Sequence, residues 1–279
     1  MTNRAYYSTR KGRQAKADPL SLEKAVRLFI NVFDGLDEKG YFQQAFGYTC
    51  VDGGAFGSVG HDQEAFFFRK LKKDVWPLHK YAETYTEDDF FDVIEVLHDL
   101  VAKPTDGRYH SFSDCGYHYY AFDEEGGHQE YREQVNEILA DYGAGFELSQ
   151  TGEILTRPDP GLEPLLETPV ASGQPEAVDA RVQAAIGKFR RRGASVEDRL
   201  DAIRDLAAVL EYLRPEAKRV LESKDESDLF NIANNFAIRH HNRQQATRYD
   251  RDVWYPWMFY FYLATIHAIV RLLERPRQP

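Results

Sequence analysis

The sequence has few cysteines and one long apolar run. Only Cys50 and Cys115 occur among the 279 residues, which excludes a disulfide framework and favours a reducing, cytoplasmic compartment. The opening residues lack the apolar run of a signal peptide. The one long apolar stretch, residues 254–273, is interrupted by a proline, a histidine and an arginine. We therefore expect a buried core helix there, and no membrane partner.

Basic residues are fewer than acidic ones. The sequence has 35 Lys and Arg and 45 Asp and Glu, which gives a net charge of -10. This balance excludes a uniformly basic nucleic-acid coat protein. The deficit is uneven, because residues 1–174 carry a net charge of -13 and residues 175–279 a net charge of +3. A polyanion such as RNA would approach the C-terminal part, although a charge of +3 is also ordinary for a segment of that length.

Prolines gather in one place, with five of the twelve in residues 157–175. Proline fixes its own φ and disfavours helix at the residue before it, so this stretch predicts a linker or an irregular strap. We expect an N-terminal sensing or regulatory module in residues 1–156, the linker in 157–175, and a helical domain in 176–279. The 43% of hydrophobic residues is enough for real cores and excludes wholesale disorder.

Apolar residues at helical spacing predict a mainly α fold. The C-terminal domain is expected to be an up-and-down four-helix bundle, with its second helix capped by Ser195 and Asp198. Its helices are expected at about 176–192, 196–221, 227–237 and 254–273. The N-terminal module is expected to be α-rich, with Thr86 as the cap of one helix and a short β-hairpin at 145–156. Its helices are expected at about 20–33, 66–76, 87–101 and 129–142.

A polar motif, residues 231–244, stands at the end of the third predicted C-terminal helix. It contains Asn231, Asn234, Asn235, Arg239, His240, His241, Asn242 and Arg243. Arginine holds a phosphate in a planar fork, and histidine near neutrality can take a proton from a ribose 2′-hydroxyl or give one to a leaving oxygen. Such a set would suffice for RNA cleavage without a metal ion. The structural alternative is that these groups cap the helix or pair with a partner subunit.

The polar motif resembles that of a HEPN domain. The run from Asp228 to Asn242, followed by Tyr249-Asp250 and the aromatic stretch from Trp254, is similar to abortive-infection proteins of the AbiJ type. Residues 7–10, 91–95 and 142–148 resemble the N-terminal module of that group. The resemblance implies bacterial phage defence, a cytoplasmic homodimer, a phage-derived or cellular trigger, and an endoribonuclease that cuts tRNA or mRNA and needs no cofactor.

Within this interpretation each polar group has an expected role. Arg239 binds the scissile phosphate, His240 or His241 acts as acid and base, and Asn235 and Asn242 orient them. Two further arginines, Arg243 and Arg248, are expected to bind RNA.

The motif departs from the HEPN nuclease pattern, in which a histidine follows the arginine after four to six residues. After Arg239, the corresponding positions are Gln244, Gln245 and Ala246, and the histidines come immediately after the arginine. The alternative is therefore a non-catalytic HEPN-like dimer scaffold that binds a protein or nucleotide signal. His267 could approach in space, but a histidine on an apolar helix is more often a hydrogen-bonded core residue.

A second group, His110, Cys115 and His118, with His128 ten residues later, offers ligands for zinc and supports a third hypothesis, a metal enzyme. Its spacing matches no standard zinc module, and the tyrosines that follow indicate an aromatic core segment.

Two further stretches favour structural roles. An acidic stripe is typical of a solvated helix face, although paired carboxylates can hold magnesium; it consists of Asp88, Asp92, Glu95 and Asp99. The glycine-rich run 52–60 is no P-loop and predicts a flexible loop.

Overall fold

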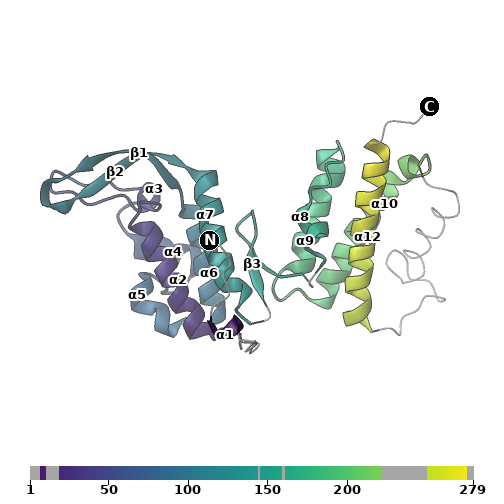
Figure 1. Cartoon of the computed structure of the whole chain (residues 1–279), viewed down its shortest axis with the longest axis horizontal. Helices are drawn as coiled ribbons and strands as arrows, with labels where there is room; N and C mark the ends of the chain where they lie inside the picture. The colour runs from purple at the N-terminus through teal and green to yellow at the C-terminus, as the bar shows by residue number, and fades with distance from the viewer. Residues whose placement is uncertain (1–6, 11–18, 144, 159–160, 221–249, 275–279) are drawn as a thin grey trace. The chain divides into compact units, whose positions relative to one another are not determined.

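A computed structural model describes residues 7–10, 19–143, 145–158, 161–220 and 250–274 (Figure 1). The chain divides into two compact units, Met1–Arg157 and Pro158–Pro279, and each has a hydrophobic core of its own. The described residues are rich in helix, with two small antiparallel hairpins. The mainly α fold with minor β that the sequence predicts is confirmed at this level.

The N-terminal unit surrounds three longer helices with short helical turns and two hairpins. Its helices are α1 (Tyr7–Arg10), α2 (Leu22–Asp37), α3 (Gln43–Phe46), α4 (Gln63–Leu71), α5 (Leu78–Tyr81), η1 (Ala82–Thr84), α6 (Glu87–Leu100), η2 (Phe112–Asp114) and α7 (Glu124–Ala140). Its strands are β1 (Lys103–His110), β2 (Gly116–Asp123), β3 (Phe146–Leu148) and β4 (Ile154–Thr156). The hairpin predicted at 145–156 is β3–β4.

Helix α6 begins where the sequence predicts. The Asp89 amide donates to the Thr86 hydroxyl at 3.2 Å, and the Thr86 amide donates to the Asp89 carboxylate at 2.9 Å. This reciprocal pair satisfies two amides that the first helical turn would otherwise leave without acceptors. The expected Thr86 cap is therefore confirmed.

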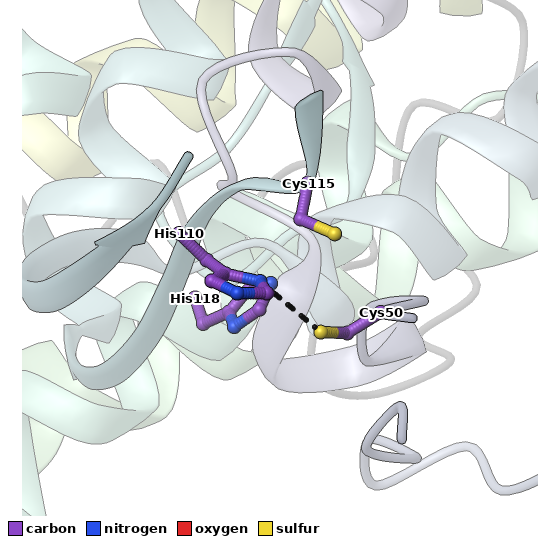
Figure 2. A group of neighbouring side chains, drawn as sticks. All are labelled: Cys50, His110, Cys115 and His118. Atoms are coloured by element: carbon purple, nitrogen blue, oxygen red, sulfur yellow. Dashed lines mark hydrogen bonds between the residues drawn. The ribbon is translucent and has the colours of Figure 1, made fainter. Parts of the chain in front are cut away.

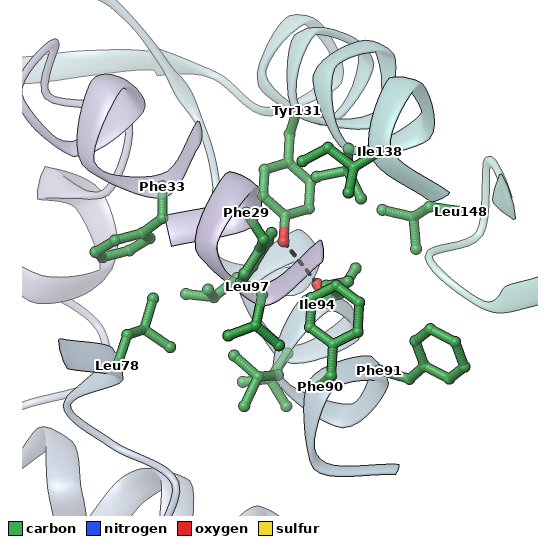
Figure 3. Close-up of a cluster of buried hydrophobic side chains, with 14 of the residues drawn as sticks. Phe29, Phe33, Leu78, Phe90, Phe91, Ile94, Leu97, Tyr131, Ile138 and Leu148 are labelled. Atoms are coloured by element: carbon green, nitrogen blue, oxygen red, sulfur yellow. Dashed lines mark hydrogen bonds between the residues drawn. The ribbon is translucent and has the colours of Figure 1, made fainter. Parts of the chain in front are cut away.

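The core of the N-terminal unit lies where α2, α6 and α7 meet (Figure 3). Phe29 packs edge-on against Phe90 and Tyr131, with ring centroids 5.7 and 6.4 Å apart. Tyr131 is fully buried, and its hydroxyl donates to the Ile94 carbonyl at 3.0 Å. Each large side chain buried in this way contributes about 1.5–3 kcal/mol to stability.

The β1–β2 hairpin extends from these helices (Figure 1), and the sequence did not predict it. The segment around Tyr119 and Tyr120 was expected in an aromatic core. That expectation is wrong, because it forms strand β2 and the side chain of Tyr120 is 68% exposed. Gln43 of α3 fixes the hairpin, accepting from the Tyr119 amide at 3.1 Å and donating to the Tyr117 carbonyl at 3.0 Å.

In the C-terminal unit, α10 packs against both α9 and α12. Its helices are α8 (Glu163–Glu167), the π-helical turn η3 (Pro175–Asp179), α9 (Ala180–Arg190), α10 (Val196–Ala217) and α12 (Arg251–Glu274). The predicted Ser195 and Asp198 capping box is present, and the Asp198 amide donates to the Ser195 hydroxyl at 3.0 Å. The third predicted helix lies in residues 221–249, outside the described part of the chain.

The proline-rich segment does more than connect two units. It contains α8, and Leu166 and Val170 are buried in the C-terminal core. The ring Nε2 of His267 on α12 donates to the Leu165 carbonyl at 3.1 Å. Burial lowers the pKa of His267, so this residue is a neutral, hydrogen-bonded core histidine.

Helix α12 is long and apolar enough to cross a membrane by length and composition alone. The core helix of a soluble protein passes the same test. Here Met258, Phe259, Tyr262 and Leu263 are fully buried in the C-terminal core. This burial agrees with the buried core helix expected from the sequence.

His98 on α6 makes the stability of the N-terminal unit sensitive to pH. It is only 3% exposed, and desolvation together with His128, stacked at 4.3 Å, lowers its pKa to about 4. An unfolded histidine takes up a proton near pH 6.5, whereas folded His98 does so only near 4. The contribution of His98 to the free energy of unfolding is therefore complete above pH 6.5. Below that pH we expect the free energy of unfolding to fall by up to about 1.4 kcal/mol per pH unit.

Hydrogen exchange of the α6 amides between pH 7 and 5.5 measures this loss, after correction for the intrinsic pH dependence of exchange. His98→Leu is expected to show a weaker pH dependence than the wild type. His61→Gln, at an exposed position of the same unit, is the control and should keep the wild-type slope. Equal slopes in the wild type and His98→Leu would contradict the prediction.

Candidate metal centre

The turn between β1 and β2 carries three side chains that can ligate a metal. His110 ends β1, Cys115 comes directly before β2, and His118 lies within β2 opposite Arg108. The 3-10 turn η2 between the strands includes Ser113 in a left-handed conformation, at φ 52°. This turn brings together the three residues that the sequence predicts as the metal alternative.

A fourth ligand comes from a loop far away in the sequence. Cys50 lies between Tyr48 and Ala55, whose amides and carbonyls pair in both directions at 2.9 and 3.0 Å. Its Sγ lies 3.4 Å from Nδ1 of His110 (Figure 2). The ligand atoms of Cys50, His110, Cys115 and His118 all lie within 4.8 Å of one another, and we call these residues the Cys/His cluster.

The surroundings of the Cys/His cluster hold its imidazoles in place. Asp52 Oδ2 lies 3.3 Å from Nε2 of His110, while the other ring nitrogen of His110, Nδ1, faces Cys50. The ring of His118 stacks on that of Tyr48 with centroids 4.0 Å apart, and its buried Nε2 has no hydrogen-bond partner among the residues that the structure describes. Both imidazoles are therefore oriented by neighbours.

The thiol of Cys50 experiences opposing influences. A hydrogen bond from the Asp52 amide, at 3.4 Å from the sulfur, lowers its pKa. Desolvation and the neighbouring Cys115 raise it, and the net result is a raised pKa. A bound cation would reverse this balance, because a coordinating thiol is deprotonated.

Cys50 was missing from the predicted ligand set, and His128 was wrongly considered for it. Sixty residues separate Cys50 from His110, so no local spacing links them. The available signal was that Cys50 is the only other cysteine in the chain. His128 instead stacks on His98.

The acidic stripe of α6 is engaged in structural contacts. Asp99 pairs with Lys70 at 3.2 Å, and Asp92 lies 4.0 Å from Lys73. Glu95 accepts from the amide of Ile154 at 2.7 Å. These partners support the structural alternative over a magnesium site.

The glycine-rich run, expected as a flexible loop, is closely packed where it passes α3. A Cβ on Gly57 would lie 2.3 Å from the Ala45 carbonyl carbon and oxygen. The loop that carries Cys50 is thus built onto α3. A surface hollow of about 710 Å³ lies beside it, bordered by Tyr48, Phe56 and Tyr119 among others.

The predicted RNA site lies outside the described residues. Its members are Asn235, Arg239, His240, His241, Asn242, Arg243 and Arg248. Their roles stay predictions from the sequence.

No protein-family model, curated protein or solved structure matches the chain. The resemblance to abortive-infection proteins therefore stays a prediction from the motifs.

Proposed function

We propose that the chain is an antiphage effector of the abortive-infection type. In this proposal the C-terminal unit is a HEPN-like domain that cuts RNA without a metal ion, and the N-terminal unit senses or regulates. The observation that carries the proposal is the polar motif, in which Arg239 and two histidines stand in the sequence between α10 and α12. Those two helices pack against one another in the C-terminal unit.

The proposed reaction is attack of a ribose 2′-hydroxyl on the adjacent phosphorus. One histidine, His240 or His241, takes the hydroxyl proton, and a proton is returned to the leaving 5′-oxygen. A 2′,3′-cyclic phosphate and a free 5′-hydroxyl result, so atoms and charges balance. Arg239 neutralises the phosphate, while Asn235 and Asn242 orient the groups. The uneven charge supports this division, because the acidic N-terminal unit repels RNA and the C-terminal unit does not.

Loss of Arg239 is expected to abolish this activity. Arg239→Ala should lower the rate of tRNA or total RNA cleavage in EDTA by about 100-fold or more, since positioned phosphate and proton-transfer groups contribute that much. Arg219→Ala, at an exposed arginine near the end of α10, is the matched control and should cut RNA as the wild type does. Cyclic phosphate ends on the fragments would identify the chemistry.

A second candidate, a non-catalytic HEPN-like scaffold, is favoured by the absence of a histidine four to six residues after Arg239. Phage protection in cells distinguishes the two. If Arg239→Ala protects cells as well as the wild type and their RNA stays intact, the nuclease proposal is wrong. The proposed homodimer can be measured in the same preparations by sedimentation.

A further inference from the structure

We propose that the Cys/His cluster binds one Zn²⁺ in a closed structural site of the N-terminal unit. Two thiolates and two imidazoles make a Cys₂His₂ set, which is typical of structural zinc. The set consists of Cys50, His110, Cys115 and His118. The proposal concerns a different unit and a different chemistry from the proposed RNA cleavage.

The distances fit a tetrahedral ion. With Zn–S near 2.3 Å and Zn–N near 2.0–2.1 Å, neighbouring ligand atoms of a tetrahedron lie about 3.3–3.8 Å apart. Cys50 Sγ and His110 Nδ1 are 3.4 Å apart, and all four ligand atoms lie within 4.8 Å of one another. A contraction of less than about 1.5 Å in the longest separation therefore completes the site.

Contacts around the four ligands also support zinc binding. Zinc-bound histidines usually donate their second ring N–H to a carboxylate, a backbone carbonyl or a water molecule, which fixes the tautomer. His110 has this arrangement, with Nδ1 towards Cys50 and Nε2 3.3 Å from Asp52. Within the described part of the chain, the buried Nε2 of His118 has no hydrogen-bond partner, as expected of a nitrogen that can serve as a metal ligand.

The ligand set indicates both the metal and its role. A mixed sulfur and nitrogen set suits zinc, whereas magnesium and calcium take oxygen ligands. Four protein ligands fill a tetrahedron and leave no position for water or substrate, so the site is structural. The ion would join the Cys50 loop to the β1–β2 turn across sixty residues of sequence. Closing so long a loop is where a cross-link contributes most in chain-entropy terms.

Metal analysis of the full-length protein tests the proposal directly. After purification from zinc-supplemented medium without chelator, we expect one zinc per chain by mass spectrometry of the elements. Replacement by Co²⁺ should give the visible bands of a tetrahedral site and thiolate-to-cobalt charge transfer. Cys115→Ser should lose the charge-transfer intensity of one thiolate and most of the bound zinc.

A variant that keeps all four ligands guards against simple misfolding. Asp52→Asn is expected to weaken zinc binding by about 10–100-fold in competition with a chromogenic chelator. Asp74→Asn removes the same charge at an exposed position of the same unit and should leave the affinity unchanged. Equal affinities in these two variants would show that Asp52 does not support a bound ion.

Two outcomes would overturn the proposal. One is a folded protein that carries no zinc and gives no tetrahedral cobalt spectrum. The other is a Cys50–Cys115 disulfide in protein purified without oxidant, detected by alkylation and intact mass. Neither measurement involves RNA, so the zinc proposal and the nuclease proposal can fail separately.

Discussion

Tyr131→Ala is expected to cost the N-terminal unit about 3–5 kcal/mol, enough to unfold a marginal domain. The side chain is fully buried between α2 and α6 and packs edge-on against Phe29 (Figure 3). Truncation removes this contact, opens a cavity and removes the hydroxyl donor to the Ile94 carbonyl. The C-terminal unit should stay folded, because the described residues of its core are all different from those of this one.

Hydrogen exchange followed peptide by peptide separates the two units in the intact chain. In Tyr131→Ala, α2, α6 and α7 should lose protection while α10 and α12 keep theirs. Tyr131→Phe keeps the ring and removes only the hydroxyl, so its cost should be about 1 kcal/mol. Equal loss of protection in both units would mean that they unfold as one.

Gly47→Ala is expected to destabilise the N-terminal unit by about 3 kcal/mol or more. Gly47 has φ 77° and ψ -161°, a conformation that residues with a Cβ rarely adopt. An added Cβ would lie 2.0 Å from the carbonyl oxygen of Ala55, so the pairing of Tyr48 with Ala55 must break. Because Cys50 lies in the same loop, zinc binding should weaken as well.

Thermal unfolding by calorimetry, together with the zinc affinity, measures both effects. Gly35→Ala is the matched control, since Gly35 lies in α2 and an added Cβ there meets no atom of the described residues within 4 Å. That change should raise stability by about 0.5–1 kcal/mol, as alanine is the better helix former. A Gly47→Ala protein as stable as the wild type would show that the loop rearranges at little cost.

Features specified by a few neighbouring residues could be predicted from the sequence. The caps at Thr86 and Ser195 depend on residues three positions away, and both are present. The β3–β4 hairpin follows from alternation around a glycine turn. Helix α4 ends at Leu71, earlier than predicted, with Lys72 in the left-handed conformation. Such stops depend on local backbone geometry that apolar spacing does not reveal.

The β1–β2 hairpin could not be predicted from periodicity. Strand β1 contains Pro104 and Gly107, which both disfavour strands, and no residue of either strand is buried. Neither strand therefore has the apolar alternation that marks a half-buried strand. The hairpin is held by polar contacts from elsewhere, such as those of Gln43 and the pairing of Lys103 with Glu130.

The candidate metal centre was predicted only as far as its local part. His110, Cys115 and His118 lie within nine residues, and the sequence places them together. Cys50 joins them only through the packing of its loop beside α3, which requires glycine at positions 47 and 57. Long-range packing of this kind leaves no pattern in a single sequence.

The separate cores of the two units also bear on how such a protein can change over generations. Among the residues that the structure describes, no buried apolar residue of one core belongs to the other. A recombination event near Arg157 and Pro158 would exchange one unit and leave the packing of the other core intact. Under changing selection, one unit could be replaced repeatedly while the other is inherited unchanged.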